Sequence, residues 1–454
     1  MTSTDPRDDA NTRERTDIGS FGVAVPKNSR EPPDKEYCDV RKRKSTLANI
    51  LETLLKLESK VLIFNTSSPL KIVLDHNNQT CLILIMKSSR RFWNEFKIYK
   101  FVLWPCGVWP SEKRSLIDIF FYLVATISQI FIATLVSEEI YGTCGTPADL
   151  LDYYAFFVCF IMSFIKLLCM RLHFIKMYRN CLYAQKNWTK VVDTNVLKIM
   201  QRYANVAKKF YHVQMFAAIC VVSLYVVNPF ILPRTDASNL PIQTVCSFRN
   251  LTDWEYVIVY VVQSMSLLYL AFGFIGVDVF FFGIVMHLCA QLKILQIEFN
   301  TVGKLTWRLD NIRLMALYSK KHYQLIMLAN DLKTTFSATF FIALKINNKF
   351  LALKSTQAFP ILFLEVFLYC YAGQLLQYEF SNITNSIYNS RWYALPPKLR
   401  QYYLLFGMTA GNKAFRLTAG QLVNVDMRLF IYFVKTIFSF FSLLLLMFDK
   451  RAKK

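Results

Sequence analysis

Glycine and proline are scarce in this chain, at 13 and 14 residues among 454. Both residues punctuate turns and loops, so the chain is not built from many tight turns. The five histidines are widely dispersed, and the eleven cysteines include no Cys-x-x-Cys pair of the kind that zinc sites and redox motifs use. A nucleophile–base set and a phosphate-binding loop are missing as well. The sequence therefore predicts no enzyme, no metal and no cofactor.

The N-terminal region lacks the apolar core that a signal peptide needs. Residues 1–45 are polar and charged, and they end in the basic run Arg41-Lys42-Arg43-Lys44. Such a composition buries too little apolar surface to fold, which predicts disorder. The apolar stretches at 61–64 and 81–86 are too short to cross a bilayer. We expect residues 1–90 to form a polar, disordered extension.

Long apolar runs dominate the rest of the chain, and 54% of all residues are hydrophobic. A run of about 20 such residues indicates a transmembrane helix, because a helix satisfies its own backbone hydrogen bonds in lipid. The fifth run is the weakest, since Asp331 and Lys333 interrupt it. The sequence predicts an all-α membrane protein with seven transmembrane helices, at residues 117–136, 152–170, 213–232, 256–286, 325–344, 358–376 and 428–448.

The net charge of +22 comes from basic residues that gather on one side of these helices. When successive connections are assigned to opposite sides, 40 Lys and Arg fall on the side of the N-terminus and 9 on the other. Positive residues concentrate in the cytoplasm, so topology explains the charge without a nucleic-acid partner. We expect a cytoplasmic N-terminus and an extracellular C-terminus. G-protein-coupled receptors have the reverse orientation, and their Asn-Pro-x-x-Tyr motif is missing from the seventh run.

Two cysteines and one glycosylation sequon fall in connections expected outside the cell. Cys144 and Cys246 either form a disulfide or, like the other cysteines, pack as small hydrophobic side chains. Five Asn-x-Ser/Thr sequons occur, at Asn65, Asn78, Asn187, Asn250 and Asn382. Only Asn250 lies in an outer connection, so we expect only this residue to carry a glycan.

A set of motifs in fixed order surrounds the last two apolar runs. The sixth run ends in Tyr371-Ala372-Gly373-Gln374, the following loop contains Trp392-Tyr393 and Pro396, and Leu417-Thr418-Ala419-Gly420 precedes the seventh run. This order and spacing resemble the C-terminal signature of insect odorant receptors. A fainter similarity lies at Gly107-Val108-Trp109-Pro110, before the first run. Residues 1–90 and 345–357 depart from the family pattern, and Phe440 stands where the family commonly has Tyr.

The resemblance implies an odorant-gated, non-selective cation channel in the plasma membrane of sensory neurons. It implies a hetero-tetramer with the obligate odorant co-receptor, and a small volatile odorant as ligand. Residues 91–376 would hold the first six helices and the ligand pocket, 377–427 a cytoplasmic region between subunits, and 428–454 the pore-lining seventh helix and a short tail. Large apolar side chains can close a pore by dewetting, and the resemblance assigns this gate to Leu443, Leu446 and Met447. Lys435 either faces the inner vestibule, or pairs with an acid or snorkels to the interface.

An odorant pocket is expected to be concave and apolar, with a few polar anchors. In the predicted topology the outer ends of the second, third, fourth and sixth helices converge. Each candidate has an ordinary alternative, since aromatic residues also gather at membrane interfaces. The candidate ligand-binding residues are Tyr153, Tyr154, Phe157, Tyr225, Tyr260, Gln263, Ser264, Phe359 and Phe363. In the fourth helix, Asp278 is expected to face the bundle or the inner interface, away from lipid.

Two other functions are weighed against the odorant receptor. A gustatory-type receptor would carry a Thr-Tyr start and a terminal Gln-Phe in the seventh helix, and 436–445 has neither. A secondary transporter would show internal repeats and helices broken by Gly or Pro near the midplane, and the span lengths show no such pairing. The connection at 287–324 is short, which argues against the co-receptor itself.

Overall fold

The computed structural model describes residues 91–112, 115–142, 147–231, 240–242, 244, 252–304, 308–350, 359–412, 415–420 and 422–452. These residues all belong to the second of two compact units, His76–Lys454. The expectations for residues 1–90, for the Cys144–Cys246 pair and for Asn250 lie outside the described residues.

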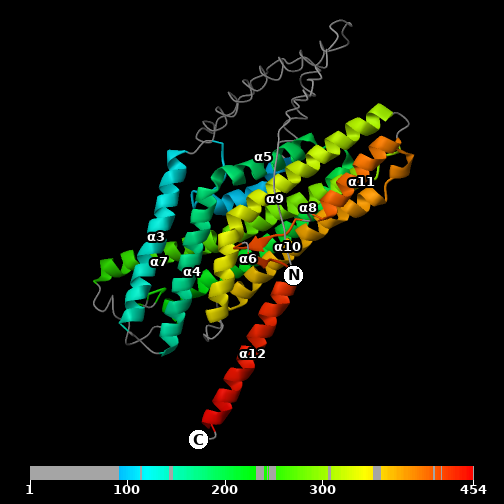
Figure 1. Cartoon of the computed structure of the whole chain (residues 1–454). Helices are drawn as coiled ribbons and strands as arrows, with labels where there is room; N and C mark the ends of the chain where they lie inside the picture. The colour runs from blue at the N-terminus through cyan, green and yellow to red at the C-terminus, as the bar shows by residue number, and fades with distance from the viewer. Residues whose placement is uncertain are drawn as a thin grey trace, which may run out of the picture. The chain divides into compact units, whose positions relative to one another are not determined.

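The described chain is almost entirely helical (Figure 1). Residues 91–103 are helical and precede the labelled elements. The helices and strands that follow are α3 (Leu116–Tyr141), α4 (Pro147–Leu172), α5 (Phe174–Lys190), α6 (Thr194–Ile231), α7 (Asp253–Ala271), the π-helical turn η1 (Phe272–Gly276), α8 (Val277–Phe299), α9 (Arg308–Phe350), α10 (Phe359–Tyr388), the 3₁₀ turn η2 (Trp392–Ala394), α11 (Pro397–Asn412), β1 (Thr418–Ala419), β2 (Val423–Asn424) and α12 (Met427–Ala452).

Six of the seven predicted spans each lie within one of these helices, apart from one residue at the end of the third span and one at the start of the sixth. The fourth span runs through α7, η1 and α8, which follow one another without a break. Four helical stretches are long and apolar enough to cross a membrane by composition, at Leu116–Tyr141, Asp152–Leu172, Thr194–Ile231 and Asp253–Phe299. The fifth, sixth and seventh spans correspond to parts of α9, α10 and α12. The prediction of an all-α membrane fold is therefore confirmed.

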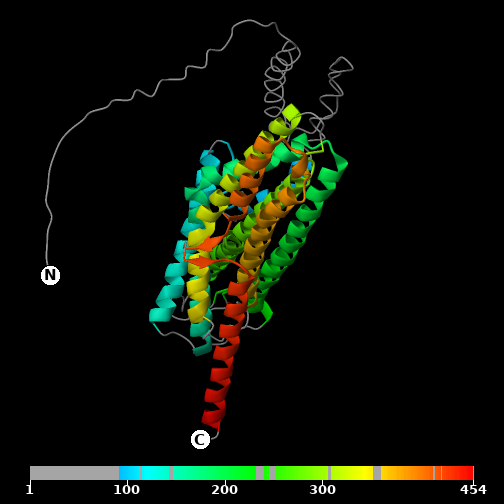
Figure 2. The same ribbon diagram turned by 45° about the vertical axis from the view of Figure 1, so that its right-hand side comes forward.

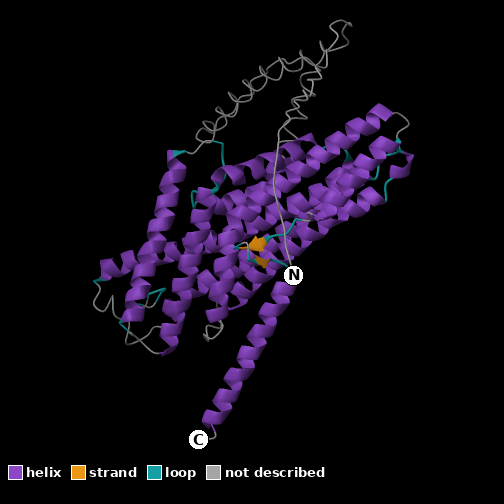
Figure 3. Cartoon of the chain, viewed as in Figure 1, coloured by secondary structure: helices purple, strands orange, loops and turns teal. Residues whose placement is uncertain are grey.

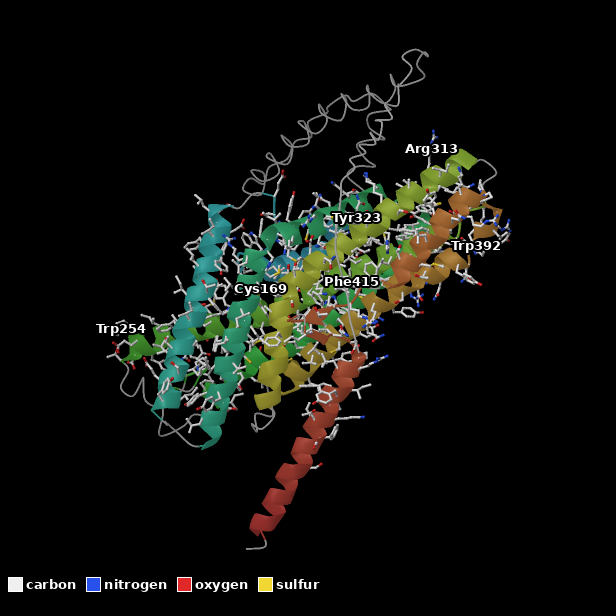
Figure 4. All side chains as sticks on the ribbon, in the orientation of Figure 1. Cys169, Trp254, Arg313, Tyr323, Trp392 and Phe415 are labelled. Atoms are coloured by element: carbon white, nitrogen blue, oxygen red, sulfur yellow. The ribbon has the colours of Figure 1, made fainter. Side chains whose placement is uncertain are left out.

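Several helices are longer than a bilayer requires. α6 contains 38 residues, which at about 1.5 Å per residue exceeds a hydrocarbon core of about 30 Å. α9 is longer still, at 43 residues. Such helices are long enough to continue beyond a bilayer. α8 and α9 reach the end of the unit that carries η2 and α11, where Phe299 of α8 contacts Tyr318 of α9 and Phe406 of α11. Figure 4 shows Trp254, in α7, and Trp392, in η2, at opposite ends of this unit.

Local sequence explains where two of the membrane-spanning helices begin. Ser115 caps α3, and Asp118 closes the reciprocal capping box. Thr252 and Glu255 form the same arrangement at the start of α7. Each box satisfies backbone N–H groups that the first helical turn leaves unpaired.

The core of the unit is built around α8. Every residue from Val277 to Ala290 is buried, and α8 packs against α6, α9 and α10. A helix that is apolar on all sides is stable only when other helices surround it. α8 therefore fixes the relative positions of the helices that carry the candidate sites.

A small hairpin joins the bundle to α12 (Figure 3). Strands β1 and β2 pair antiparallel, with Thr418 opposite Asn424. α12 packs against α10 near its start and then leaves the bundle (Figure 2). Phe433 is buried, whereas Phe438, little more than one turn later, is 66% exposed.

Candidate functional site

An aromatic cluster occupies the space between α3, α4, α6 and α7, at the end that carries Trp254. Tyr153 and Phe160 of α4 are buried there with Ile132, Leu267 and Ile242. Two other candidates, Phe157 and Tyr225, pack against this cluster and are partly buried. The structure therefore brings together three predicted ligand-binding aromatics from two helices. We call the buried residues named above, together with Phe157 and Tyr225, the outer cluster.

The polar candidates of α7 make bonds within the protein. Gln263 is buried, and its Oε1 accepts a hydrogen bond from the backbone N–H of Ile242 at 3.0 Å. Tyr260 donates to the carbonyl of Val226 at 2.6 Å, and Ser264 donates to the carbonyl of Tyr260 at 2.8 Å. The amide nitrogen of Gln263 is buried and has no hydrogen-bond partner among the described residues. It is therefore an unsatisfied hydrogen-bond donor beside the outer cluster.

Tyr154 and Phe363 lie apart from the outer cluster. Tyr154 is 43% exposed and faces a groove between α3 and α4. Phe363 packs against Phe430 of α12, with ring centroids 5.2 Å apart. The side chain of Phe359 lies outside the described residues. A ligand-binding role for these residues stays a prediction.

A buried ionic cluster lies deeper in the bundle, where α4, α8 and α10 meet. Lys166 Nζ is 2.7 Å from Asp278 Oδ2 and 2.8 Å from Glu365 Oε1, and all three side chains are almost fully buried. The hydroxyl of Tyr369 donates to the other oxygen of Asp278. The prediction that Asp278 faces the bundle is confirmed. We call Lys166, Asp278, Glu365 and Tyr369 the ionic cluster.

The ionic cluster is tied to the π-helical turn and lies near α12. Lys166 Nζ donates to the carbonyl of Phe274 at 3.1 Å and lies 3.6 Å from the centroid of its ring. On the opposite face of α10, Phe367 and Phe363 contact Phe430 of α12. Buried charges within a bilayer are costly and are usually functional. Sequence reasoning missed the pairing with Glu365, although a lone carboxylate in the sixth apolar run was a visible signal.

The signature glycines mark close contacts around the hairpin. A Cβ added to Gly373 would lie 2.0 Å from the carbonyl oxygen of Val425, so α10 can approach the chain before α12 only with glycine there. Gly420 has φ of +56°, a left-handed conformation that glycine adopts readily, and its N–H donates to Ser337 Oγ of α9. Thr418 lies beside it in β1.

The remaining signature residues occupy α10 and the turn before α11. Tyr371 stacks on Phe210 of α6 and on Phe367, while Gln374 is exposed. Trp392 Nε1 donates to the carbonyl of Tyr388 at 3.1 Å. The carbonyl of Pro396 accepts from Arg400, in the first turn of α11. Tyr393 is 62% exposed, so the adjacent aromatics do not form a buried pair within this chain.

A stripe of apolar side chains is exposed along α11. Tyr402, Leu405 and Met408 recur at helical spacing and are all exposed. The opposite face holds Tyr403, whose hydroxyl donates to the carbonyl of Phe299 and whose pKa burial raises to about 12. α11 is therefore anchored on one face and presents the other outward. We call Tyr402, Leu405 and Met408 the α11 stripe.

The predicted pore residues all lie in α12. Lys435 is exposed and makes no ion pair with any described residue. The backbone at Leu443, Leu446 and Met447 is helical, whereas their side chains lie outside the described residues. Their gating role stays a prediction.

Together these features define an integral membrane protein that crosses the bilayer several times, with apolar and ionic clusters inside its helical bundle. The family model described as 7tm Odorant receptor matches residues 146–347 and 352–438. The chain belongs to this receptor family, which favours the first of the functions weighed above. The break in the match falls within the segment 345–357 that departs from the family pattern.

Solved structures of insect olfactory receptors share the fold. The insect olfactory receptor OR5 from Machilis hrabei matches with a TM-score of 0.68 and 14% identity, over 79% of this chain and 99% of that chain. The same receptor in complex with eugenol matches with a TM-score of 0.64 and 14% identity, over 80% and 99%. No curated protein matches this sequence significantly.

Proposed function

We propose that this protein is the odorant-binding subunit of an odorant-gated, non-selective cation channel in the plasma membrane of sensory neurons. Membership of the odorant receptor family carries the proposal. α12 gives independent support, because Lys435, Thr436, Phe438 and Ser439 are all exposed on a helix that leaves the bundle. A transmembrane helix with polar and apolar faces needs neighbouring subunits on its polar side.

The outer cluster is proposed to bind a small volatile odorant. Its side chains are aliphatic and aromatic, and the amide nitrogen of Gln263, which has no partner among the described residues, supplies one hydrogen-bond donor. Apolar walls with few polar groups are typical of small-molecule sites. The relative from Machilis hrabei binds eugenol, an aromatic molecule with oxygen acceptors.

The obligate odorant co-receptor is the proposed partner, in a hetero-tetramer. The α11 stripe supports this assembly, since exposed apolar side chains at regular spacing are typical of protein interfaces. The proposed orientation has a cytoplasmic N-terminus and an extracellular C-terminus. It rests on the distribution of 40 and 9 basic residues across the membrane.

Whole-cell current over an odorant panel tests the proposed function. The chain is expressed with the co-receptor, with the co-receptor alone as the control. We expect at least one odorant to evoke a cation current only when both subunits are present. A Gln263→Leu variant that reaches the surface should respond more weakly to odorants that carry an acceptor. Surface-expressed pairs that respond to no odorant, with a co-receptor agonist still active, would argue against the proposal.

A further inference from the structure

A groove adjoining the outer cluster runs between α3 and α4. Its volume is about 470 Å³, and apolar side chains dominate its walls. Ile130 and Tyr154, on its two sides, are both substantially exposed. Phe157 and Phe160 contribute to both the groove and the outer cluster. Both helices are long and apolar enough to cross a membrane, so we expect the groove to open laterally to lipid.

One polar group lies at the inner end of the groove without a partner. Gln129 of α3 is 99% buried, and its Nε2 donates to the carbonyl of Tyr269 at 3.3 Å. This bond fixes the orientation of the amide, because a carbonyl can only accept. Gln129 Oε1 is therefore an acceptor, and no described residue donates to it. A buried acceptor without a donor carries a desolvation penalty.

The position of Gln129 along α3 restricts what can supply that donor. Twelve residues separate it from Tyr141, at the end of the helix, which corresponds to about 18 Å. Gln129 thus lies near the middle of a hydrocarbon core of about 30 Å. A lipid in the outer leaflet would bring only its acyl chain to this depth. An acyl chain has no hydrogen-bond donor, so it would leave the amide unsatisfied.

We propose that the α3–α4 groove is a second ligand site, reached from the bilayer, for a small apolar molecule that carries one hydrogen-bond donor. An alkyl phenol or alcohol fits this description. Its donor would bond to Gln129 Oε1, and its apolar body would lie between Ala133 and Phe157. Such molecules partition into lipid, which brings them to the open side of the groove.

Competitive photolabelling in membranes tests this site, with the chain expressed alone so that channel activity is not required. The probe is 4-propylphenol with a diazirine on its alkyl chain. The competitors are 4-propylphenol and its methyl ether, which differ only in the donor. We expect labelled peptides from residues 129–164, and competition by the phenol at about tenfold lower concentration than by the ether.

Two variants and two matched controls identify the groups involved. Gln129→Leu should abolish the difference between phenol and ether, whereas Gln263→Leu, which alters the buried amide of the outer cluster, should preserve it. Ala133→Phe fills the groove and should remove the labelling, whereas Ile127→Phe, on the exposed face of the same helix, should not. Equal competition by phenol and ether in the unmodified chain, or labelling that Ala133→Phe leaves intact, would overturn the proposal. The first of these results would assign the groove to acyl chains and the amide to water.

Discussion

Lys166 neutralises part of a cluster that contains two carboxylates and lies wholly within the bundle. Removing one partner from a buried ion pair leaves an uncompensated charge, which typically costs about 3–5 kcal/mol. We therefore expect Lys166→Met to lower the thermal midpoint of the detergent-solubilised receptor strongly. Fluorescence-detected size-exclusion after heating measures this midpoint. Lys435→Met, which alters an exposed lysine, is the control and should change it little.

Neutralising the whole cluster separates charge from packing. Lys166→Met combined with Asp278→Asn and Glu365→Gln leaves no unpaired ion, so we expect much of the stability to return. A single Lys166→Met variant as stable as the parent would show that the cluster does not hold charged groups together.

His322 of α9 makes stability depend on pH. It precedes the predicted fifth span, and its ring packs against those of Phe380 and Phe406. Burial lowers its pKa from 6.5 to about 4, because the charged form loses hydration. The unfolded chain therefore binds a proton more readily than the folded chain between these values. Stability from this residue is complete above about pH 6.5 and declines as pH falls towards 4, by up to about 3 kcal/mol.

The matched variant for this prediction is His322→Phe, which keeps an aromatic ring and cannot titrate. Thermal midpoints measured from pH 7.5 to 4.5 should fall more steeply for the parent than for the variant. Parallel curves for the two proteins would contradict the assigned pKa.

The sequence predicts that some site residues are buried, but it does not predict which residues they contact. Asp278 could be assigned to the bundle interior because an ionised group facing lipid is so unfavourable. Its partners Lys166 and Glu365 are 112 and 87 positions away from it, and sequence periodicity does not report which helices meet. Phe363 illustrates the same limit, since it lies in the correct helix yet contacts Phe430 of α12. Side-chain direction depends on how α10 is rotated, which tertiary packing sets.

At the scale of elements, the apolar runs predict every long helix, because burial in lipid requires helical structure. The weak fifth span also has a structural explanation. Asp331, which interrupts it, pairs with Arg179 of α5 at 2.8 Å. Helices outside the membrane were not predicted, since α5 and α11 carry polar faces that resemble ordinary loops in composition. The hairpin before α12 has strands of only two residues, too short for an alternating pattern.

The α11 stripe yields a prediction about assembly. Leu405→Glu places a charge at the centre of the exposed apolar stripe, which disfavours burial against a partner. We expect co-purification with the co-receptor to fall severalfold at unchanged total expression. Val192→Glu, at an exposed position between α5 and α6, introduces the same charge change and is the control. Equal recovery of the co-receptor with both variants would exclude the stripe from the interface.

For α12, the predicted gate can be tested through hydration. Leu443→Ser, Leu446→Ser and Met447→Ser each place a hydroxyl where a dewetted constriction is proposed. We expect current without odorant, or altered ion selectivity, when a variant is co-expressed with the co-receptor. The effect is diluted in a mixed tetramer, since the partner's residues also line the pore. Normal surface levels with unchanged basal current for all three variants would remove the gating role.

At the scale of the whole molecule, orientation links the separate proposals. A cytoplasmic N-terminus puts the outer cluster outside and the α11 stripe inside the cell, as an odorant site and an inner assembly surface require. The distribution of basic residues supports this orientation. When residues 1–116 are left out of the count, 20 Lys and Arg still fall in the connections assigned to the cytoplasm and 9 in those assigned to the outside. The basic tail Lys450–Lys454 is a local exception, on the side expected to be poor in positive charge.

Epitope accessibility and glycan mapping test this orientation independently. A tag at residue 20 should stain only after permeabilisation, whereas a tag at the C-terminus should stain intact cells. Among the sequons, only Asn250 should carry a glycan, because oligosaccharyl transfer occurs on the side that becomes extracellular. Asn187 and Asn382 serve as internal controls, since both lie in segments assigned to the cytoplasm, and Asn187 also contacts His287 at 3.4 Å. A C-terminal tag hidden in intact cells, or a glycan on Asn187 or Asn382, would reverse the topology. The outer cluster would then face the cytoplasm, and the proposed access of odorants from outside the cell would fail with it.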